Sequence, residues 1–161
     1  MERPKTKAVV AFWHAFRAAS GIADEDFEVV MFDHTAEVGD QLAALVLDGQ
    51  KRATASLAAS FAPGGAPPPV LGGHVVVVDG SGNPACIFRT AELRIGPMDS
   101  VTDAFAWIEG EGDRSRAWWL AAHRKFFTRE AARLGIAMHD GIATVFERFV
   151  VVWPPEAADP D

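Results

Sequence analysis

Residues 74–93, HVVVVDGSGNPACIFRTAEL, contain the pattern that decides the fold. Apolar runs over 74–79 and 85–93 flank the tetrapeptide GSGN, and glycine and asparagine in such a position are typical of hairpin turns. Two strands joined by so short a turn must run antiparallel, because a parallel pair needs a crossover of roughly a dozen or more residues. We therefore expect a sheet built around an antiparallel hairpin.

The spacing of apolar residues around this hairpin predicts the remaining elements. Helical periodicity is found in four segments: 8–19, 36–48, 101–108 and 115–134. Thr6 and Thr35 are the expected N-caps of the first two helices, Gly21 the expected end of the first, and Asp99 or Ser100 precedes the third. Short apolar or alternating runs predict further strands over 27–32, 50–57 and 144–153.

The order of these elements indicates an α+β fold. Helices and strands interleave without regular βαβ alternation, and neither GxGxxG nor GxxxxGK[ST] is present. We expect a small curved β-barrel flanked by helices. At 161 residues, the chain is predicted to form a single domain over 1–153 with an N-terminal helix, followed by a disordered polar tail over 154–161.

Composition excludes several classes of function. The net charge of −7 argues against non-specific binding to duplex DNA, although a small basic pocket for one nucleotide is allowed. Cys86 is the only cysteine, so an internal disulfide is excluded and a reducing cytoplasm is the expected location. The chain contains neither an apolar run of membrane-spanning length nor an export signal, and without tyrosine no mechanism can use a phenol.

The segment GQKRATAS (49–56) is the first candidate site, because two cations and two hydroxyls directly follow a predicted helix. The intervening alanines leave room for a ligand to approach the backbone. Alternatively, Lys51 and Arg52 complement the negative end of the helix dipole and the hydroxyls merely occupy strand positions. In a regular strand Lys51 and Thr54 would point to opposite faces, so a turn or bulge must intervene if they are to meet.

The acidic loop EGEGD (109–113) is the second candidate. Crowded carboxylates raise one another's pKa and can supply a proton donor near neutral pH. They could also hold a divalent cation, although EF-hand spacing and histidine ligands are missing. Alternatively, Asp113 or Ser115 caps the following helix and the other acids favour its positive end. The sequence leaves these interpretations open.

The other chemically distinctive side chains fit packing better. His123 falls on the apolar stripe of the helix over 115–134, which is typical of a hydrogen-bonded core residue. Trp118 and Trp119 also resemble core residues, although one exposed ring could stack on a base. The remaining histidines show no ligand spacing, and no serine lies in a nucleophile elbow.

Taken in order, four segments resemble the ASCH-domain family, and in particular its longer bacterial subgroup with an EGEGD loop. They are DQLAALVLDGQKRATASL (40–57), HVVVVDGSGNPACIFRT (74–90), FAWIEGEGDRSRAWWLAAHRKFF (105–127) and FERFVVVW (146–153). The resemblance extends from about Phe12 to Trp153. It implies a PUA-like β-barrel wrapped by helices, with a cleft suited to RNA or a nucleoside.

The resemblance also implies site residues. Some family members are proposed RNA binders or coactivators, some cleave RNA, and a short subgroup removes the acetyl group from N4-acetylcytidine. In that subgroup the lysine and threonine of a G-x-K-x-x-T element and a later glutamate form the site, and these fall here on Lys51, Thr54 and Glu109. These three are the expected catalytic residues, and the expected substrate contacts are Arg52, Ser56, Glu111, Asp113 and Arg114.

Two hypotheses of function follow. The first is a cytoplasmic hydrolase that cleaves RNA or an acylated nucleoside, without a cofactor unless the acidic loop holds a divalent cation. The second is a non-catalytic RNA-binding module, in which Lys51 contacts a phosphate and Glu109 an exocyclic amine. Both predict RNA, a nucleoside or a nucleotide as the partner, and neither involves a membrane or duplex DNA. The oligomeric state is not predicted.

Overall fold

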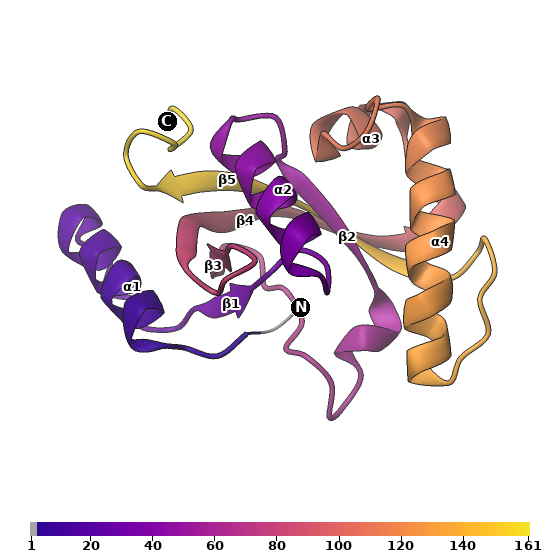
Figure 1. Cartoon of the computed structure of the whole chain (residues 1–161), viewed down its shortest axis with the longest axis horizontal. Helices are drawn as coiled ribbons and strands as arrows, with labels where there is room; N and C mark the ends of the chain where they lie inside the picture. Colours follow the sequence, from indigo (N-terminus) through magenta and orange to yellow (C-terminus); the bar gives the residue numbers. More distant parts are fainter. Residues whose placement is uncertain (1–2) are drawn as a thin grey trace.

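The predicted hairpin lies at the centre of the sheet in the computed structural model, which describes residues 3–161 (Figure 1). Strand β3 (His74–Val78) pairs antiparallel with β4 (Pro84–Pro97), from His74 opposite Arg89 to Val78 opposite Pro84. The strand order of the five-stranded sheet is β1-β3-β4-β5-β2. The hairpin and the antiparallel character of the sheet are thus confirmed.

The other three strands extend this hairpin on both sides. Strand β5 (Ala143–Trp153) runs antiparallel along β4, and β2 (Ala53–Leu57) is antiparallel to β5. Strand β1 (Glu28–Val30) is parallel to β3 at the opposite edge. The β4–β5 register shifts at Ile87/Phe88 and again at Thr90/Glu92, and such irregularities bend strands. The sheet curls into a half-barrel, which confirms the α+β, PUA-like expectation.

Four helices cover the sheet: α1 (Lys7–Ser20), α2 (Ala36–Leu47), α3 (Asp103–Glu109) and α4 (Arg116–Leu134). Two short 3-10 turns, η1 (Ala58–Phe61) and η2 (Met98–Ser100), follow β2 and β4. In Figure 1, α1 lies at one side of the sheet, α3 and α4 lie at the other, and α2 crosses between them. Each of these groups packs its own cluster of buried apolar side chains against the strands.

Capping side chains set the helix starts. The hydroxyls of Thr6, Thr35 and Ser115 accept hydrogen bonds from backbone N–H groups in the first turns of α1, α2 and α4. The start predicted for the third helix is wrong: it begins at Asp103, because Thr102 is the residue whose hydroxyl caps the Phe105 N–H. The residues before it form η2 and an extended segment.

Residues 154–161, expected from their composition to be disordered, instead lie against the sheet. The carboxylate of Asp159 accepts hydrogen bonds from Arg52 Nε and from the backbone N–H of Val151, and Ala157 packs against an apolar cluster. Within the described residues, no helix combines the length and the apolarity needed to cross a membrane.

Candidate functional site

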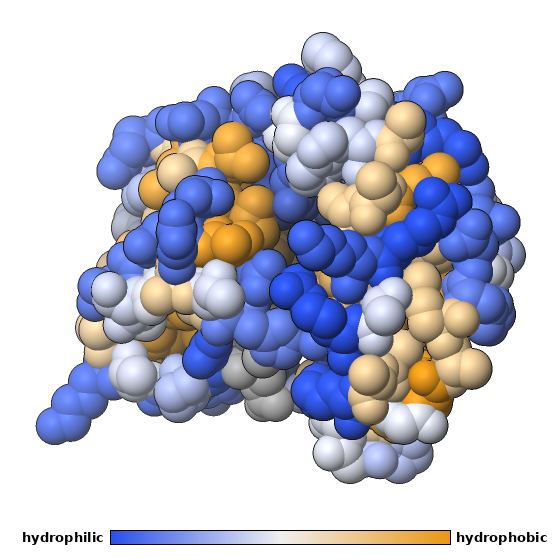
Figure 2. Space-filling model, turned by 45° about the vertical axis from the view of Figure 1, so that its right-hand side comes forward, coloured by the Kyte–Doolittle hydropathy of each residue, from blue (hydrophilic) through white to orange (hydrophobic). Residues whose placement is uncertain are grey.

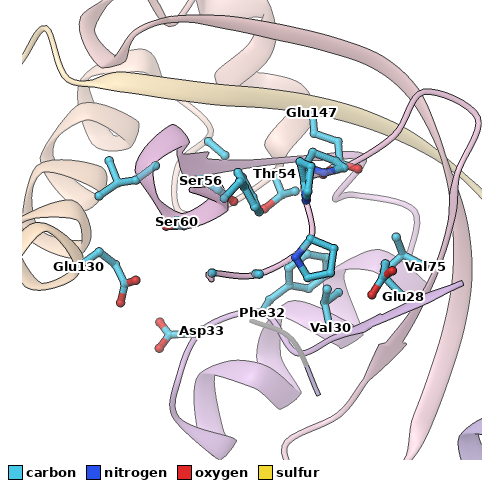
Figure 3. Close-up of a pocket in the computed structure, with 18 of the residues that line it drawn as sticks. Glu28, Val30, Phe32, Asp33, Thr54, Ser56, Ser60, Val75, Glu130 and Glu147 are labelled. Carbon is cyan, nitrogen blue, oxygen red and sulfur yellow. The ribbon is translucent and has the colours of Figure 1, made fainter. Parts of the chain in front are cut away.

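A cavity of about 1200 Å³ lies against the sheet, and its walls are formed by β1, β2, α4 and the loop over 62–73. Figure 3 shows Thr54 and Ser56 next to each other on β2, with Glu147 of β5 beside them. Phe32 and Asp33 lie on the opposite wall, and Glu130 of α4 closes one side. Residues far apart in the sequence therefore share one pocket.

Lys51 lies at the buried end of this pocket. Gly49 adopts a left-handed conformation, φ +86°, which ends the turn after α2, and the backbone N–H of Lys51 donates to Leu45 O. Side chains alternate between the two faces of a regular strand, but this strand starts only at Ala53. The alternation therefore does not determine the direction of the Lys51 side chain. This explains how Lys51 and Thr54 reach the same cavity.

The Lys51 ammonium is surrounded by oxygen atoms. Its side chain is 1% exposed. Nζ donates to Glu111 Oε2 at 2.9 Å and to the carbonyl oxygen of Ala53 at 2.8 Å, and it lies 3.8 Å from Glu109 Oε1. The ring centre of Phe32 is 5.0 Å from Nζ. Burying the charge of a lysine is costly without such partners, so the two carboxylates explain how Lys51 can be buried.

Glu109 is held by two residues of α4. Its Oε1 lies 3.2 Å from His123 Nε2, and its Oε2 accepts a hydrogen bond from Trp119 Nε1. The His123 ring stacks on Trp119 with 3.7 Å between ring centres, and Nδ1 is 2.9 Å from Trp119 O. His123 therefore belongs to the polar cluster as well as to the core, which its position on an apolar stripe did not reveal.

These contacts displace the pKa values of the cluster. Burial alone would raise the pKa of Glu109, but the adjacent His123 and Lys51 charges hold it well below its usual range. Burial alone would lower the pKa of His123, but the Glu109 carboxylate raises it. Burial raises the pKa of Glu111 against the opposing charge of Lys51, and nearby Glu109 adds to the rise. Of the two glutamates, Glu111 is the better proton carrier.

A second polar group lies on the sheet beside Thr54. In the register of β2 and β5, Thr54 is directly opposite Glu147. Glu147 is 8% exposed, and its Oε1 accepts a hydrogen bond of 2.7 Å from Thr90 Oγ1. Burial raises the pKa of Glu147. Glu147 and Thr90 are not among the site residues predicted from the sequence, where the one signal is a carboxylate in the middle of the apolar run TVFERFVVVW.

Five of the eight predicted site residues line the pocket: Lys51, Thr54, Ser56, Glu109 and Glu111. The other three lie elsewhere. Arg52 bonds to Asp159 and donates to Val46 O near the end of α2, as the dipole interpretation predicts. Asp113 is exposed and accepts from the Ser115 N–H, while the Arg114 guanidinium stacks over Trp107 at 3.9 Å.

The acidic loop does not form a cation site. Glu109 and Glu111 face Lys51, whereas the Asp113 carboxylate accepts from the backbone N–H of Ser115, the N-cap of α4, and does not join them. In residues 3–161, no group of three or more His, Cys, Asp or Glu side chains is arranged to hold a metal ion. The geometry of the loop therefore favours proton transfer by its carboxylates over binding of a divalent cation.

The walls and mouth of the pocket are charged. Acidic side chains outnumber basic ones along its lining: Asp24, Asp26, Glu28, Asp33, Glu109, Glu111, Glu130 and Glu147, against Lys51, Lys125, Arg129 and Arg133. Three of these four cations belong to α4. From the side of α4, the surface shows strongly hydrophilic side chains between two apolar patches (Figure 2). The pocket therefore suits a neutral group inside and an anionic group at the edge of α4.

Comparisons with known proteins agree with this architecture. A family model described as the ASCH domain matches residues 28–153. The solved structure of an ASCH domain from Lactobacillus crispatus is similar with a TM-score of 0.80 and 33% sequence identity, covering 89% of this chain and 93% of that one. A protein from Enterococcus faecalis, described as DUF984, gives a TM-score of 0.81 and 30% identity, with 91% and 93% covered. No curated protein matches the chain.

Proposed function

The chain belongs to the ASCH domain family, and from this membership and its buried lysine cluster we propose that it hydrolyses the amide bond of an N-acylated nucleoside. One observation carries the proposal. Lys51 is almost wholly buried between the carboxylates of Glu109 and Glu111, in a pocket that the Thr54 hydroxyl also lines. Ionisable groups with displaced pKa values inside a pocket are typical of catalytic sites.

The chemistry assigned to these residues is acyl transfer to a hydroxyl. The Thr54 oxygen attacks the acyl carbon and forms an ester as the C–N bond breaks, and water then cleaves the ester. The Lys51 ammonium stabilises the negative charge that develops on the acyl oxygen. Glu111 takes the hydroxyl proton and delivers it to the leaving amine, since its raised pKa suits both steps.

Glu109 acts in this proposal as a positioning residue. Its carboxylate is already engaged by Trp119 and His123, and its low pKa makes it a poor proton donor. Its charge instead helps to hold the Lys51 ammonium beside Glu111, in the pocket that Thr54 also lines. This differs from the role of catalytic residue, which the family resemblance implies for Glu109.

A neutral nucleoside fits this pocket better than an RNA backbone. The excess of carboxylates along the lining would repel a chain of phosphates, whereas an uncharged base and its acyl group would not be repelled. The competing function, a binding module for an RNA end, is favoured by Lys125 and Arg129 on α4 at the pocket. Turnover distinguishes the two functions.

The test is release of cytidine from N4-acetylcytidine, followed by chromatography. Wild-type protein should hydrolyse N4-acetylcytidine. In Thr54→Val, kcat/KM should fall at least about a thousandfold, because this variant lacks the nucleophilic hydroxyl. Thr54→Ser, which keeps the hydroxyl, should retain measurable turnover. Thr128→Val makes the same chemical change at an exposed position of α4 and should match the wild type.

Two results would contradict the proposal. Equal turnover by Thr54→Val and the wild type would remove Thr54 from the reaction. The second result is a wild-type protein that binds cytidine nucleosides but releases acetate from none of their acetylated forms, which would show that it is a binding module.

A further inference from the structure

We propose that Glu147 recognises the base of the substrate, by a hydrogen bond from its carboxyl group to an acceptor atom of the heterocycle. The inference rests on the proposed function in that it places a nucleoside in the pocket beside Thr54. It adds a specificity-determining residue and the class of base edge that this residue selects.

The first step is the position of Glu147 relative to Thr54. The two residues are register partners on adjacent antiparallel strands, so their side chains leave the same face of the sheet. Directly opposite residues have Cβ atoms about 4.5–5.5 Å apart. Figure 3 shows the two side chains as neighbours at the pocket. A heterocycle whose acyl group meets Thr54 therefore has its adjacent ring atoms beside Glu147.

The second step is that one oxygen of the Glu147 carboxyl group is hydrogen-bonded within the protein and the other is not. Oε1 accepts the hydrogen bond from Thr90 Oγ1, which fixes the orientation of the group. Oε2 has no hydrogen-bond partner anywhere in residues 3–161, and it is not one of the polar atoms sealed from solvent without a partner. Since Glu147 lines the cavity, Oε2 is accessible from the pocket.

The third step concerns charge. Among residues 3–161, no cation forms an ion pair with Glu147, and three arginines on or next to the strands around it contact other groups. Arg148 pairs with Glu92, Arg52 pairs with Asp159, and Arg94 lies over the ring of Phe146. The other charged cluster of the pocket is paired internally: Lys51 pairs with Glu109 and Glu111, and His123 pairs with Glu109.

A buried carboxyl without a cation is favoured in its neutral form. Burial raises the pKa of Glu147, against the opposing hydrogen bond from Thr90. In the neutral form, Oε1 is the carbonyl oxygen that accepts from Thr90, and the O–H on Oε2 is a donor directed at the cavity. The hydrogen bond with the buried Thr90 hydroxyl is a structural reason for Oε1, and it leaves Oε2 for a ligand.

The chemistry of the ligand follows from that donor. It needs a lone pair beside the acylated amine, such as the unprotonated ring nitrogen N3 or the adjacent carbonyl of a cytosine-type ring. A uracil-type ring presents an N–H at the corresponding position and would face the donor with another donor. We therefore assign Glu147 the selection of cytosine-like over uracil-like bases.

Calorimetric binding of cytidine and of 3-deazacytidine, which lacks the N3 acceptor, tests the inference without turnover. Wild-type protein should bind cytidine at least about tenfold more tightly than 3-deazacytidine. Glu147→Ala should weaken cytidine binding by a similar factor and abolish the discrimination. Glu147→Gln keeps a neutral donor and should stay within about threefold of the wild type. Glu92→Gln, at an exposed position on β4, is the matched control.

The pH profile provides a second readout that a merely structural role would not change. Wild-type affinity for cytidine should fall as the pH rises through the raised pKa of Glu147, whereas the Glu147→Gln affinity should not, since an amide does not titrate. Thermal unfolding of each variant establishes that it is folded before binding is compared.

Three results would overturn the inference. They are equal binding of cytidine and 3-deazacytidine by the wild type, cytidine binding by Glu147→Ala as tight as that of the wild type, and a loss in Glu147→Gln as large as in Glu147→Ala. Failure of the proposed hydrolysis looks different. In that case N4-acetylcytidine is not turned over, while cytidine selectivity still depends on Glu147.

Discussion

At the scale of single residues, the charged side chains whose burial costs the most free energy lie next to one another. Lys51, Glu109 and His123 are each at most 9% exposed as side chains, and each neutralises part of the charge of another. Removing one partner of a buried ion pair typically costs about 3–5 kcal/mol, because the remaining charge is stranded. A loss of activity in Lys51→Ala must therefore be measured against its folded fraction.

The pairing of His123 with Glu109 makes stability depend on pH. The raised pKa of His123 adds stability that is complete below its ordinary value of 6.5 and is lost as the pH rises through the raised value. The lowered pKa of Glu109 adds stability that is complete above 4.5 and is lost as the pH falls towards the lowered value. Both contributions are complete between pH 4.5 and 6.5.

We predict that wild-type protein exceeds His123→Gln in unfolding free energy by up to about 3 kcal/mol in that window. The difference should shrink at higher pH. Urea unfolding at a series of pH values measures it, and exposed His14→Gln controls for loss of an imidazole. A difference that stays constant up to pH 9 would contradict the assignment of the His123 charge.

The sequence could identify some of these residues and not others. Lys51, Thr54 and Glu109 belong to motifs whose order is specific, so a resemblance sufficed to select them. His123 and Glu147 each occupy one position in an apolar pattern, and such a position predicts packing. Only the register of β2 against β5 reveals that Glu147 faces Thr54.

At the scale of elements, the end of α3 is what holds Glu109 against Lys51. The Arg52 N–H donates to Ile108 O at 2.9 Å, and Gln50 Nε2 donates to Gly110 O at 2.6 Å. Gly110 has φ +79°, and a Cβ built on it would lie 2.4 Å from Gln50 O. This close approach requires a glycine for two reasons, its left-handed backbone and the missing side chain.

Gly110→Ala should therefore cost more than Gly21→Ala. Gly21 has a similar φ of +73° but no atom within 4 Å of a built Cβ, so alanine there meets only backbone strain of about 1–2 kcal/mol. At Gly110 the clash adds roughly a further 1–3 kcal/mol, because backbone must move. Urea unfolding of the two variants measures the difference. Equal losses would mean that α3 moves away from Gln50 without cost.

Most elements were predictable because local signals agree on them. Threonine and serine caps, left-handed glycines and the GSGN turn mark their ends, and apolar spacing marks their interiors. The start of α3 was less clear, since Asp99, Ser100 and Thr102 are all capable caps. The choice among them depends on η2, which no local pattern indicated.

At the scale of the whole molecule, the C-terminal segment was the feature hardest to foresee. A short stretch of proline, alanine and acidic residues is typical of disorder. Its attachment depends on Arg52 meeting Asp159, a contact between residues 107 positions apart. No periodicity links such positions, so the sequence offers only its composition, which predicts disorder.

Asp159→Ala should lower the free energy of unfolding by about 1.5–3 kcal/mol, because it strands the Arg52 guanidinium and the Val151 N–H. It should also expose the tail to protease. Thermal unfolding and limited proteolysis measure the two effects. Asp161→Ala, at an exposed position, should change neither. A tail that is cleaved equally fast in wild type and variant would show that the Arg52 contact does not hold it.

The charge of the whole molecule determines how it can meet nucleic acid. With a net charge of −7, few cations are free to neutralise phosphates. On the α4 side of the pocket, Arg133 already pairs with Glu130, whereas Lys125 and Arg129 form no ion pair with any residue of 3–161. At most two phosphates can then be neutralised there.

The limit of two neutralised phosphates predicts how strongly the affinity for a short single-stranded RNA depends on salt. Each neutralised phosphate of a single strand contributes about −0.7 to the slope of log affinity against log salt, so we expect a slope near −1.4 for two phosphates. Lys125→Ala and Arg129→Ala should each bring the slope closer to zero, and Arg124→Ala, whose cation is bonded to Asp140, should leave it unchanged. Duplex DNA should bind weakly at every salt concentration. Fluorescence anisotropy titrations at several salt concentrations measure all of these slopes. A duplex slope of about −4 or steeper would contradict this expectation, because it would mean that about four or more phosphates are neutralised on binding.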